Sequence, residues 1–473
     1  MRTRISGIFA IITAAVMFIT SAVIPVYADS TKTPVEDTEA NRFVDSLGAG
    51  WNLGNCFDAY DEPQNQKADD MVYETIWCHA KATKELIKTV KSAGFSTIRL
   101  PATWMNHVDK NYKINAAWLA RYKEVVDWCL DEGLYVIINT HHDVYKGYYY
   151  PSSSELAKSK KFMKRIWEQL SAAFKDYDER LIFSSINEPR LRGTSYEWWY
   201  PTWDIPAEVA DSLECVNKLN QTFVDTVRAS GGNNKTRYLL VGGYDTSEGE
   251  TGIMSKYFKM PTDTAKNRLI ADVHYYCSNL NFNSNFLNNL YRSFVAKGIP
   301  VVMSEFGLKK DYEEGYYLYD KTEVSAKKLG QIVEAARERG ISCIFWDNNY
   351  GGKGLLGFKI IDRATAKVEL PEIVKAITEA GKPAFAVSSK LTVKAVGDTG
   401  KVKLSWNKID GATKYVVYQY KNGSYSKVKV VTGTSATIKG LHSGRTFKFI
   451  VRAYVNGKLT PKSDAKAVSV QTK

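Results

Sequence analysis

Eight short apolar segments, separated by helix-like patterns, constrain this chain more than any other feature. They lie at residues 48–55, 97–101, 135–141, 181–187, 238–243, 269–276, 300–305 and 342–347. Strands that are apolar along their whole length are typical of a parallel sheet covered by helices. Helical patterns occupy the intervals at 84–93, 155–174, 209–229, 321–339 and 371–380, and Asn115 and Gly133 are expected to bound one more helix. The sequence therefore predicts a series of βα units.

Eight such units within residues 41–383 fit one α/β domain, a (β/α)8 TIM barrel. The alternative is an open, doubly wound sheet. Polar and aromatic residues follow nearly every apolar segment, whereas an open sheet concentrates its site at one switch point. We therefore favour the barrel.

The pattern changes after Lys382, where helical periodicity ends. Short alternating segments follow at 391–395, 402–406, 415–420, 427–431, 435–438, 446–455 and 468–471. Turns are expected at Gly397-Asp398, Asn422-Gly423, Ser443-Gly444 and Asn456-Gly457. We predict a small all-β sandwich domain over residues 384–473.

The core of this second domain resembles that of fibronectin type III domains. The resemblance rests on Trp406, on Leu441 ahead of Phe447, and on a later Val451. Phe447 stands where that family usually has a tyrosine, so the hydrogen bond of that corner is expected to be missing.

The N-terminus has the pattern of a secretory signal peptide, which we place at residues 1–28. Arg2 and Arg4 precede a short apolar run, and Val26-Tyr27-Ala28 offers a cleavage site. The alternative is an uncleaved anchor, but the apolar run is short for a spanning helix. We expect an N-terminal tail at 29–40 and a mature protein that is secreted, extracellular and not membrane-bound.

The net charge of +13 is concentrated near the C-terminus. Residues 386–473 carry 15 Lys and 2 Arg against 3 Asp and no Glu. Without a nucleic-acid-binding motif we expect no nucleic-acid partner. The second domain is either a spacer or a basic module that attaches to an acidic cell wall or an insoluble substrate. The six cysteines have no metal-ligand spacing, and a disulfide between Cys56 and Cys78 stays open.

The active site of a barrel lies at the C-terminal ends of its strands. The polar and aromatic residues expected there are Arg99, His141, His142, Asn187, Glu188, His274, Tyr276, Glu305 and Trp346. Two carboxylates on opposed strands suit glycoside hydrolysis, in which one protonates the leaving oxygen and the other faces the anomeric carbon. They would lie roughly 5 Å apart for retention and roughly 6.5–9.5 Å apart for inversion.

The surrounding residues distinguish the two glutamates. Arg99 and a hydroxyl from Tyr276 would keep Glu305 ionised. The negative charge of Glu305 is expected to raise the pKa of Glu188 and keep it protonated. Asn187 can bond a sugar hydroxyl beside the reacting centre.

Seven ordered motifs between about residues 45 and 350 resemble glycoside hydrolase family 5. They are Gly50-Trp51-Asn52-Leu53-Gly54-Asn55, Ile98-Arg99-Leu100-Pro101, Asn139-Thr140-His141-His142, Asn187-Glu188-Pro189, Val273-His274-Tyr275-Tyr276, Ser304-Glu305-Phe306-Gly307 and Phe345-Trp346. The resemblance implies Glu188 as acid/base, Glu305 as nucleophile, retention of configuration, and no metal or cofactor. It implies a substrate-orienting set of Arg99, His141, Asn187, His274, Tyr276 and Trp346. We also expect Trp51 and Asn52 to contact the substrate.

Aromatic residues cluster after two of the strand ends. One cluster holds Trp198, Trp199, Tyr200 and Trp203, and the other holds Tyr145, Tyr148, Tyr149 and Tyr150. Exposed rings stack on sugars, so we expect subsites of an open cleft, with Trp198 and Trp203 as the main candidates. The alternative is that some of these rings pack the loops against each other.

The resulting hypothesis is a monomeric endo-β-1,4-glucanase acting on cellulose, mixed-linkage β-glucan or xyloglucan. A mannanase or xylanase on the same scaffold is the alternative within enzymes. A non-catalytic carbohydrate-binding protein is the alternative from another class. A metal site at His141-His142 is not favoured, because the sequence offers no third ligand at a fitting spacing.

Overall fold

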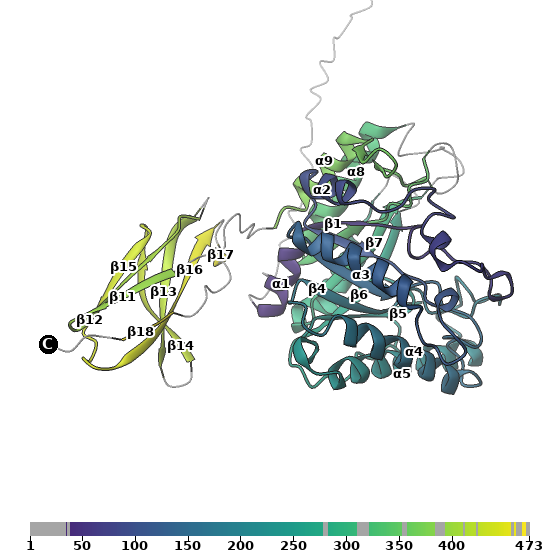
Figure 1. The fold of residues 1–473 in the computed structure, drawn as a ribbon, viewed down its shortest axis with the longest axis horizontal. Helices are drawn as coiled ribbons and strands as arrows, with labels where there is room; N and C mark the ends of the chain where they lie inside the picture. Colours follow the sequence, from purple (N-terminus) through teal and green to yellow (C-terminus); the bar gives the residue numbers. More distant parts are fainter. Residues whose placement is uncertain are drawn as a thin grey trace, which may run out of the picture. The chain divides into compact units, whose positions relative to one another are not determined.

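The computed structural model describes residues 35, 38–277, 282–309, 321–351, 357–383, 393–409, 412–421, 424–455, 458–459 and 466–469. Eight parallel strands form a closed barrel in chain order, with β8 pairing back to β1 (Figure 1). They are β1 (Ala49–Asn52), β2 (Thr97–Leu100), β3 (Tyr135–Thr140), β4 (Leu181–Ile186), β5 (Leu239–Ser247), β6 (Leu269–Cys277), β7 (Val301–Leu308) and β8 (Ile341–Phe345). The predicted barrel is confirmed, and the predicted signal peptide lies outside the described residues.

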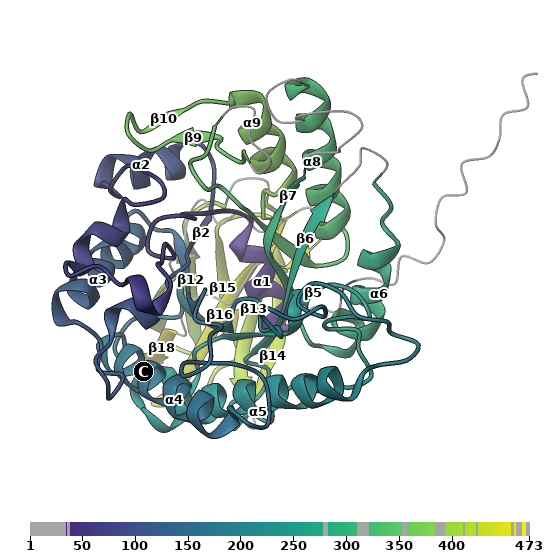
Figure 2. The same cartoon turned by 90° about the vertical axis from the view of Figure 1, so that its right-hand side faces the viewer.

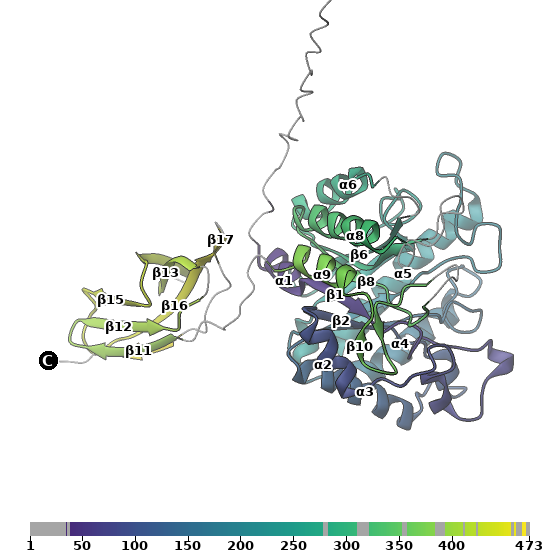
Figure 3. The same ribbon diagram turned by 90° about the horizontal axis from the view of Figure 1, so that it is seen from above.

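Helices surround this barrel (Figure 2). They are α2 (Lys84–Ser92), α3 (Ala116–Asp131), α4 (Leu156–Ala173), α5 (Ala207–Ala229), α6 (Asn285–Ser293), α8 (Thr322–Arg337) and α9 (Pro371–Ala380). In Figure 3, α6 and α8 lie on one side of the strands, and α2 and α3 lie on the other. Asn115 caps α3 as predicted, because its side chain accepts hydrogen bonds from the backbone nitrogens of Ala117 and Trp118. Helix α6 was not predicted.

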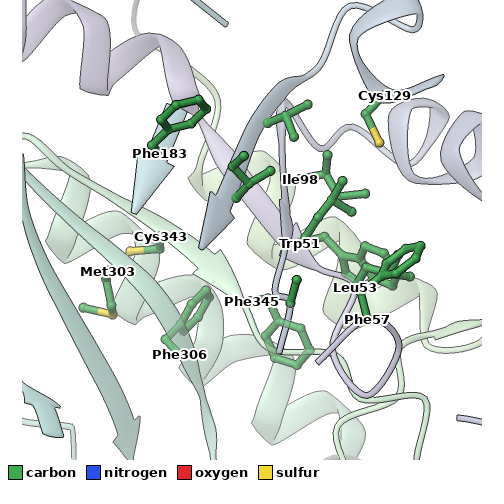
Figure 4. Packing of buried hydrophobic residues seen from close by; sticks show 14 of the residues in the cluster. Trp51, Leu53, Phe57, Ile98, Cys129, Phe183, Met303, Phe306, Cys343 and Phe345 are labelled. Atoms are coloured by element: carbon green, nitrogen blue, oxygen red, sulfur yellow. The ribbon is translucent and has the colours of Figure 1, made fainter. Parts of the chain in front are cut away.

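The strands alternate between two apolar layers. On β3, Val136 and Ile138 pack outward against the helices, while Ile137 points into the barrel. The outer layer is the larger core, and Figure 4 shows Met303, Phe306 and other side chains packed within it. Six strands each contribute one residue to the inner layer, namely Ile137, Ile182, Leu240, Ile270, Val302 and Ile344.

An additional helix, α1 (Glu39–Leu47), completes this inner layer. Thr38 caps it, and the ring of Phe43 stacks on Tyr238 with centroids 3.6 Å apart. Thr97 on β2 donates a hydrogen bond to the carbonyl of Leu47, which fixes the helix near the strand starts. Helix α1 thus covers the barrel end opposite to the C-terminal strand ends. It begins inside the segment that we expected to be a tail.

Short β-strands follow the barrel. A hairpin of β9 (Ile361–Asp362) and β10 (Lys367–Val368) precedes two antiparallel sheets. One contains β11 (Val393–Asp398), β12 (Lys401–Trp406) and β15 (Ser435–Lys439), and the other contains β13 (Ala412–Lys421), β14 (Ser424–Val431), β16 (Thr446–Val455), β17 (Lys458–Leu459) and β18 (Lys466–Ser469). Both sheets contribute to one apolar cluster that includes Trp406 and Val451. The predicted all-β region is therefore present, while its fibronectin type III identity stays a prediction.

Two details of this region differ from expectation. Gly397 and Asp398 lie inside β11, and the turn falls at Thr399 and Gly400, where Gly400 has a φ of 65°. Strand β17 was not predicted.

Among the described residues, no helix is long and apolar enough to cross a membrane. All six cysteines are buried and none forms a disulfide.

Candidate active site

Strand geometry brings the polar residues into the barrel mouth. Because side chains alternate along a strand, Asn52 and Arg99 point inward, whereas Trp51 and Ile98 pack outward. The register shifts on β6 at His274 and on β7 before Phe306. Such irregularities re-aim side chains next to active sites. As a result, His274 and Glu305 lie directly opposite each other on neighbouring strands.

Glu305 is held by one donor on each carboxylate oxygen. Arg99 Nη1 lies 2.7 Å from Oε1, and the hydroxyl of Tyr276 lies 2.6 Å from Oε2. The carboxylate is only 3% exposed, so both contacts act away from bulk water. Burial and the charge of Glu305 raise the pKa of Tyr276, which therefore stays a neutral donor. These two contacts were predicted.

Arg99 links several strand ends at once. Besides Glu305, it donates to Asn52 Oδ1 at 3.0 Å and to Asn187 Oδ1 at 2.6 Å. Its side chain is fully buried. Since the oxygen of Asn187 accepts the bond from Arg99, its amide nitrogen remains as a donor for a sugar hydroxyl.

Glu188 follows β4 and is more open than Glu305, with 17% of its side chain exposed. His274 Nδ1 lies 3.1 Å from Glu188 Oε1 and 3.6 Å from Glu305 Oε2. Both carboxylates therefore face the same imidazole nitrogen. One oxygen of each glutamate and this nitrogen all lie within 4.8 Å of one another.

The expected protonation of Glu188 is wrong for this arrangement. Burial raises the pKa of Glu188, but the hydrogen bond and charge of His274 and the charge of Arg190 outweigh burial and hold the pKa below its ordinary value. Burial lowers the pKa of His274, but the charges of Glu305 and Glu188 bring it above its ordinary value. We had expected a raised pKa of Glu188 because we considered only the negative charge of Glu305, and not His274 and Arg190. The contact with His274 therefore favours the carboxylate form of Glu188 and the protonated form of the imidazole.

His141 and Trp346 form a stacked pair of rings beside Glu305. Their rings are parallel within 2° at a centroid separation of 5.7 Å, and His141 Nε2 lies 4.0 Å from Glu305 Oε1. Burial and the neighbouring charges of His142 and Arg99 lower the pKa of His141 well below its ordinary value, so the ring is neutral. A Cβ on Gly54 would come within 2.7 Å of the Trp346 ring, so only glycine lets the indole lie where it does.

Trp51 and Asn52 are not accessible to a substrate, which corrects their assignment as substrate contacts. Both side chains are fully buried. The indole nitrogen of Trp51 donates to Asp347 Oδ2 at 3.0 Å. The amide of Asn52 donates to the backbone carbonyl of Ser304 at 2.9 Å, and its oxygen accepts from Arg99. Asn52 therefore supports Arg99 and the backbone next to Glu305, while Trp51 holds Asp347.

The aromatic loops divide into buried and exposed rings. Tyr149, Tyr150 and Tyr200 are buried, so they pack the loops together. Trp198, Trp199 and Trp203 are 59%, 58% and 80% exposed. Trp199 and Trp203 form a pair with centroids 6.0 Å apart, while Trp198 lies on the guanidinium of Arg190. The exposed tryptophans fit the predicted subsites, and their role stays a prediction.

Several residues near the site were not singled out from the sequence. Asn139 bonds His141 Nδ1 at 3.0 Å and so orients its ring. Tyr60 and Trp77 lie beside His142, with centroids 5.2 and 5.7 Å from the imidazole. Arg190 contacts Glu188. Its position two residues after this strand-end glutamate is a sequence signal that could have predicted the contact.

Two groups of side chains have metal-ligand proximity among the described residues. They are Asp58 with His141 and His142, and Glu188 with His274 and Glu305. Asp58 is the third ligand that the sequence did not show, but its two oxygens already accept the backbone N–H groups of Asn55 and Cys56. In the second group, the guanidinium groups of Arg99 and Arg190 already place positive charge at the carboxylates. Neither donor set fits a resident cation.

Comparisons with known proteins agree with this site. The family described as Cellulase (glycosyl hydrolase family 5) matches residues 58–352. Endoglucanase A of Clostridium longisporum is 37% identical over 360 residues, which cover 72% of this chain and 65% of that relative, just under two thirds of its length.

Solved structures give the same result. A mutant of a family 5 lichenase from Caldicellulosiruptor sp. F32, in complex with cellotetraose, superposes with a TM-score of 0.68 at 41% identity, covering 74% of this chain and 96% of that one. A family 5 xyloglucanase from Paenibacillus pabuli has a TM-score of 0.61 at 32% identity, covering 72% and 99%. This chain belongs to glycosyl hydrolase family 5.

Proposed function

We propose that the protein is a secreted, monomeric, retaining endo-β-1,4-glucanase, with Glu305 as nucleophile and Glu188 as acid/base. The observation that carries this proposal is the pair of buried and half-buried carboxylates whose nearest oxygens lie within 4.8 Å. Retaining glycosidases hold their two carboxyl groups roughly 5–5.5 Å apart, which leaves no room for an intervening water.

In the first step, an oxygen of Glu305 attacks the anomeric carbon while Glu188 gives a proton to the glycosidic oxygen. The C–O bond to the leaving sugar breaks, and a glycosyl ester with Glu305 forms. His274 Nδ1 lies 3.1 Å from Glu188 Oε1, so Glu188 can take up this proton through the imidazole. In the second step, Glu188 takes a proton from water, which attacks the ester and releases Glu305.

A β-glucan is the substrate class that the surroundings favour. Trp346 is a half-buried indole close to the glutamates, and Trp199 and Trp203 are exposed rings on the loop after Glu188, where they can stack on sugars. The similar proteins are named endoglucanase, lichenase and xyloglucanase, all names for β-glucan hydrolases. Cellulose, mixed-linkage β-glucan and xyloglucan are therefore the substrates to test first, with mannan and xylan as the alternatives.

The test is a reducing-sugar assay on these five polysaccharides, with NMR of the anomeric proton formed first. We expect β-glucan cleavage with an early fall in viscosity and an initial β product. Glu305→Gln should abolish turnover with an unchanged melting temperature, while Glu250→Gln, an exposed glutamate after β5, should keep it. An initial α product would contradict retention, and activity in Glu305→Gln would contradict the nucleophile.

A further inference from the structure

Arg190 lies against the glutamate that we assign as acid/base. Its Nη1 donates to the backbone carbonyl of Glu188 at 2.9 Å and lies 3.6 Å from carboxylate Oε2. The arginine side chain is only 7% exposed. One buried guanidinium group therefore contacts both the backbone and the carboxylate of Glu188.

Neighbouring residues hold this guanidinium in place. Nε of Arg190 donates to Glu197 Oε1 at 3.1 Å, and the other oxygen of Glu197 accepts from the backbone of Gly193 at 2.9 Å. The indole of Trp198 covers the guanidinium at 4.0 Å. A cation that is covered by an aromatic ring and removed from water acts more strongly on a nearby charge.

We propose that Arg190 is a positioning residue that orients Glu188 and stabilises its charged form during both steps of the reaction. This inference rests on the proposed acid/base role of Glu188. It gives Glu197 and Trp198 a role as well, because they keep Arg190 against Glu188. It also gives the indole of Trp198 a function besides sugar stacking.

The two steps explain why a cation is useful here. While Glu305 is ionised, its charge opposes ionisation of Glu188, whereas in the glycosyl ester this opposition is gone. Glu188 must lose its proton in the first step and remain a carboxylate until it activates water. A fixed positive charge favours that carboxylate throughout.

Other charged or titratable groups face Glu188 from the surrounding strands and loops. The effect of Arg190 must therefore be measured by comparing the titration of Glu188 in the unchanged protein and in an Arg190 variant. These groups are His142, Tyr149, Asp245, His274, Tyr276 and Glu305. A substitution at Arg190 leaves all six in place, and a change in the titration of Glu188 then reports the contribution of Arg190.

The experiment compares Arg190→Gln, which removes the charge, with Arg190→Lys, which keeps it. The titration of Glu188 is followed by 13C NMR of glutamate-labelled protein, with its signal assigned by loss in Glu188→Gln. In parallel, kcat/KM is measured against pH on a soluble β-glucan. We expect the pKa of Glu188 and the basic limb of the profile to rise by about one unit in Arg190→Gln. Arg190→Lys should move both by much less.

Arg192→Gln is the matched control, because Arg192 lies on the same loop but bonds Tyr60 and Glu62. It should leave the titration of Glu188 unchanged. Trp198→Ala tests the same idea at an exposed position if Arg190→Gln does not fold. Water then screens the guanidinium, and the basic limb should move upward from its position in the unchanged protein, by less than about one unit.

An unmoved titration in both Arg190→Gln and Trp198→Ala, with activity lost, would make Arg190 a structural residue and overturn the proposal. Equal shifts in Arg190→Gln and Arg190→Lys would overturn it too. The NMR titration needs no turnover. If no polysaccharide is cleaved, the proposed function fails while the effect of Arg190 on Glu188 is still measured.

Discussion

At the scale of single residues, the site depends on which side chain donates a hydrogen bond to each carboxylate oxygen of Glu305. Glu305 receives a charged donor on Oε1 and a neutral one on Oε2. Arg99 is also engaged with Asn52 and Asn187, so it cannot follow a displaced carboxylate. Tyr276 is the partner that can be removed without dismantling the rest.

We therefore predict that Tyr276→Phe lowers kcat/KM with little effect on folding. A hydrogen bond to a charged group contributes about 1.5–3 kcal/mol, which corresponds to a loss of roughly 10- to 150-fold. Steady-state kinetics on a soluble β-glucan measures the loss. Tyr275→Phe is the control, because that ring faces the helices and stacks on Phe286 at 4.1 Å. Equal losses in both variants would contradict a specific role for the Tyr276 hydroxyl.

The sequence alone identified the strand-end residues but not their pairing. Glu188, Glu305, Arg99 and Tyr276 could be placed together because parallel strands end at one rim. The hydrogen bond from His274 to Glu188 depends on the register shift in β6, and register is not visible in a periodic apolar pattern. For that reason the predicted direction of the pKa shift of Glu188 was wrong.

At the scale of elements, α1 shows how stability and chemistry occupy opposite ends of the barrel. Its buried residues complete the inner layer next to the strand starts, while the carboxylates lie at the strand ends. Residues at the N-terminal face of such barrels serve stability, and those at the C-terminal face serve catalysis.

Phe43→Ala should accordingly destabilise the protein without changing its chemistry. Removing a buried phenylalanine costs about 3–5 kcal/mol, and here the stacking on Tyr238 is lost as well. We expect a lower melting temperature, and an unchanged kcat per folded molecule below that temperature. Glu39→Ala on the same helix removes only an exposed ion pair with Arg268 and should have little effect. A fall in kcat equal to that of a site variant would contradict this separation.

The sequence held a signal for α1 that went unused. Thr38 can cap a helix, and Ala40, Phe43, Val44 and Leu47 follow at helical spacing. The segment was short and adjoined a polar stretch, so it resembled a tail. The misplaced turn at Gly397 has a different cause, since β11 simply continues through a residue pair that usually ends strands.

At the scale of the whole chain, charge separates the catalytic and C-terminal regions. On the exposed face of β12 and β15, Lys401 and Lys439 lie directly opposite each other, and Lys403 lies two residues along. Like charges directly opposite each other on neighbouring strands repel. The ion pair of Lys401 with Asp398 offsets part of this repulsion. A polyanion bound to this face would offset the remainder.

We predict that the full chain binds an acidic cell-wall preparation at low salt, and that a chain ending at Pro383 does not. Release should follow as ionic strength approaches about 1 M, where charges are screened beyond roughly 3 Å. Pull-down at two salt concentrations measures this, with turnover of a soluble β-glucan as the control that both chains should share. A double variant with Lys403→Gln and Lys439→Gln should bind less. Equal binding by the truncated chain would favour a spacer.

The six cysteines are buried and none forms a disulfide, which has a consequence for how this protein can be made. The described part of the fold contains no disulfide that an oxidant would have to form. The barrel should therefore reach the same native state in a reducing cytosol as outside a cell. Its folding yield should then be indifferent to dithiothreitol and to disulfide isomerases. Such an enzyme should remain folded in an anaerobic, thiol-rich environment, in which a hydrolase stabilised by disulfides would be reduced and would unfold.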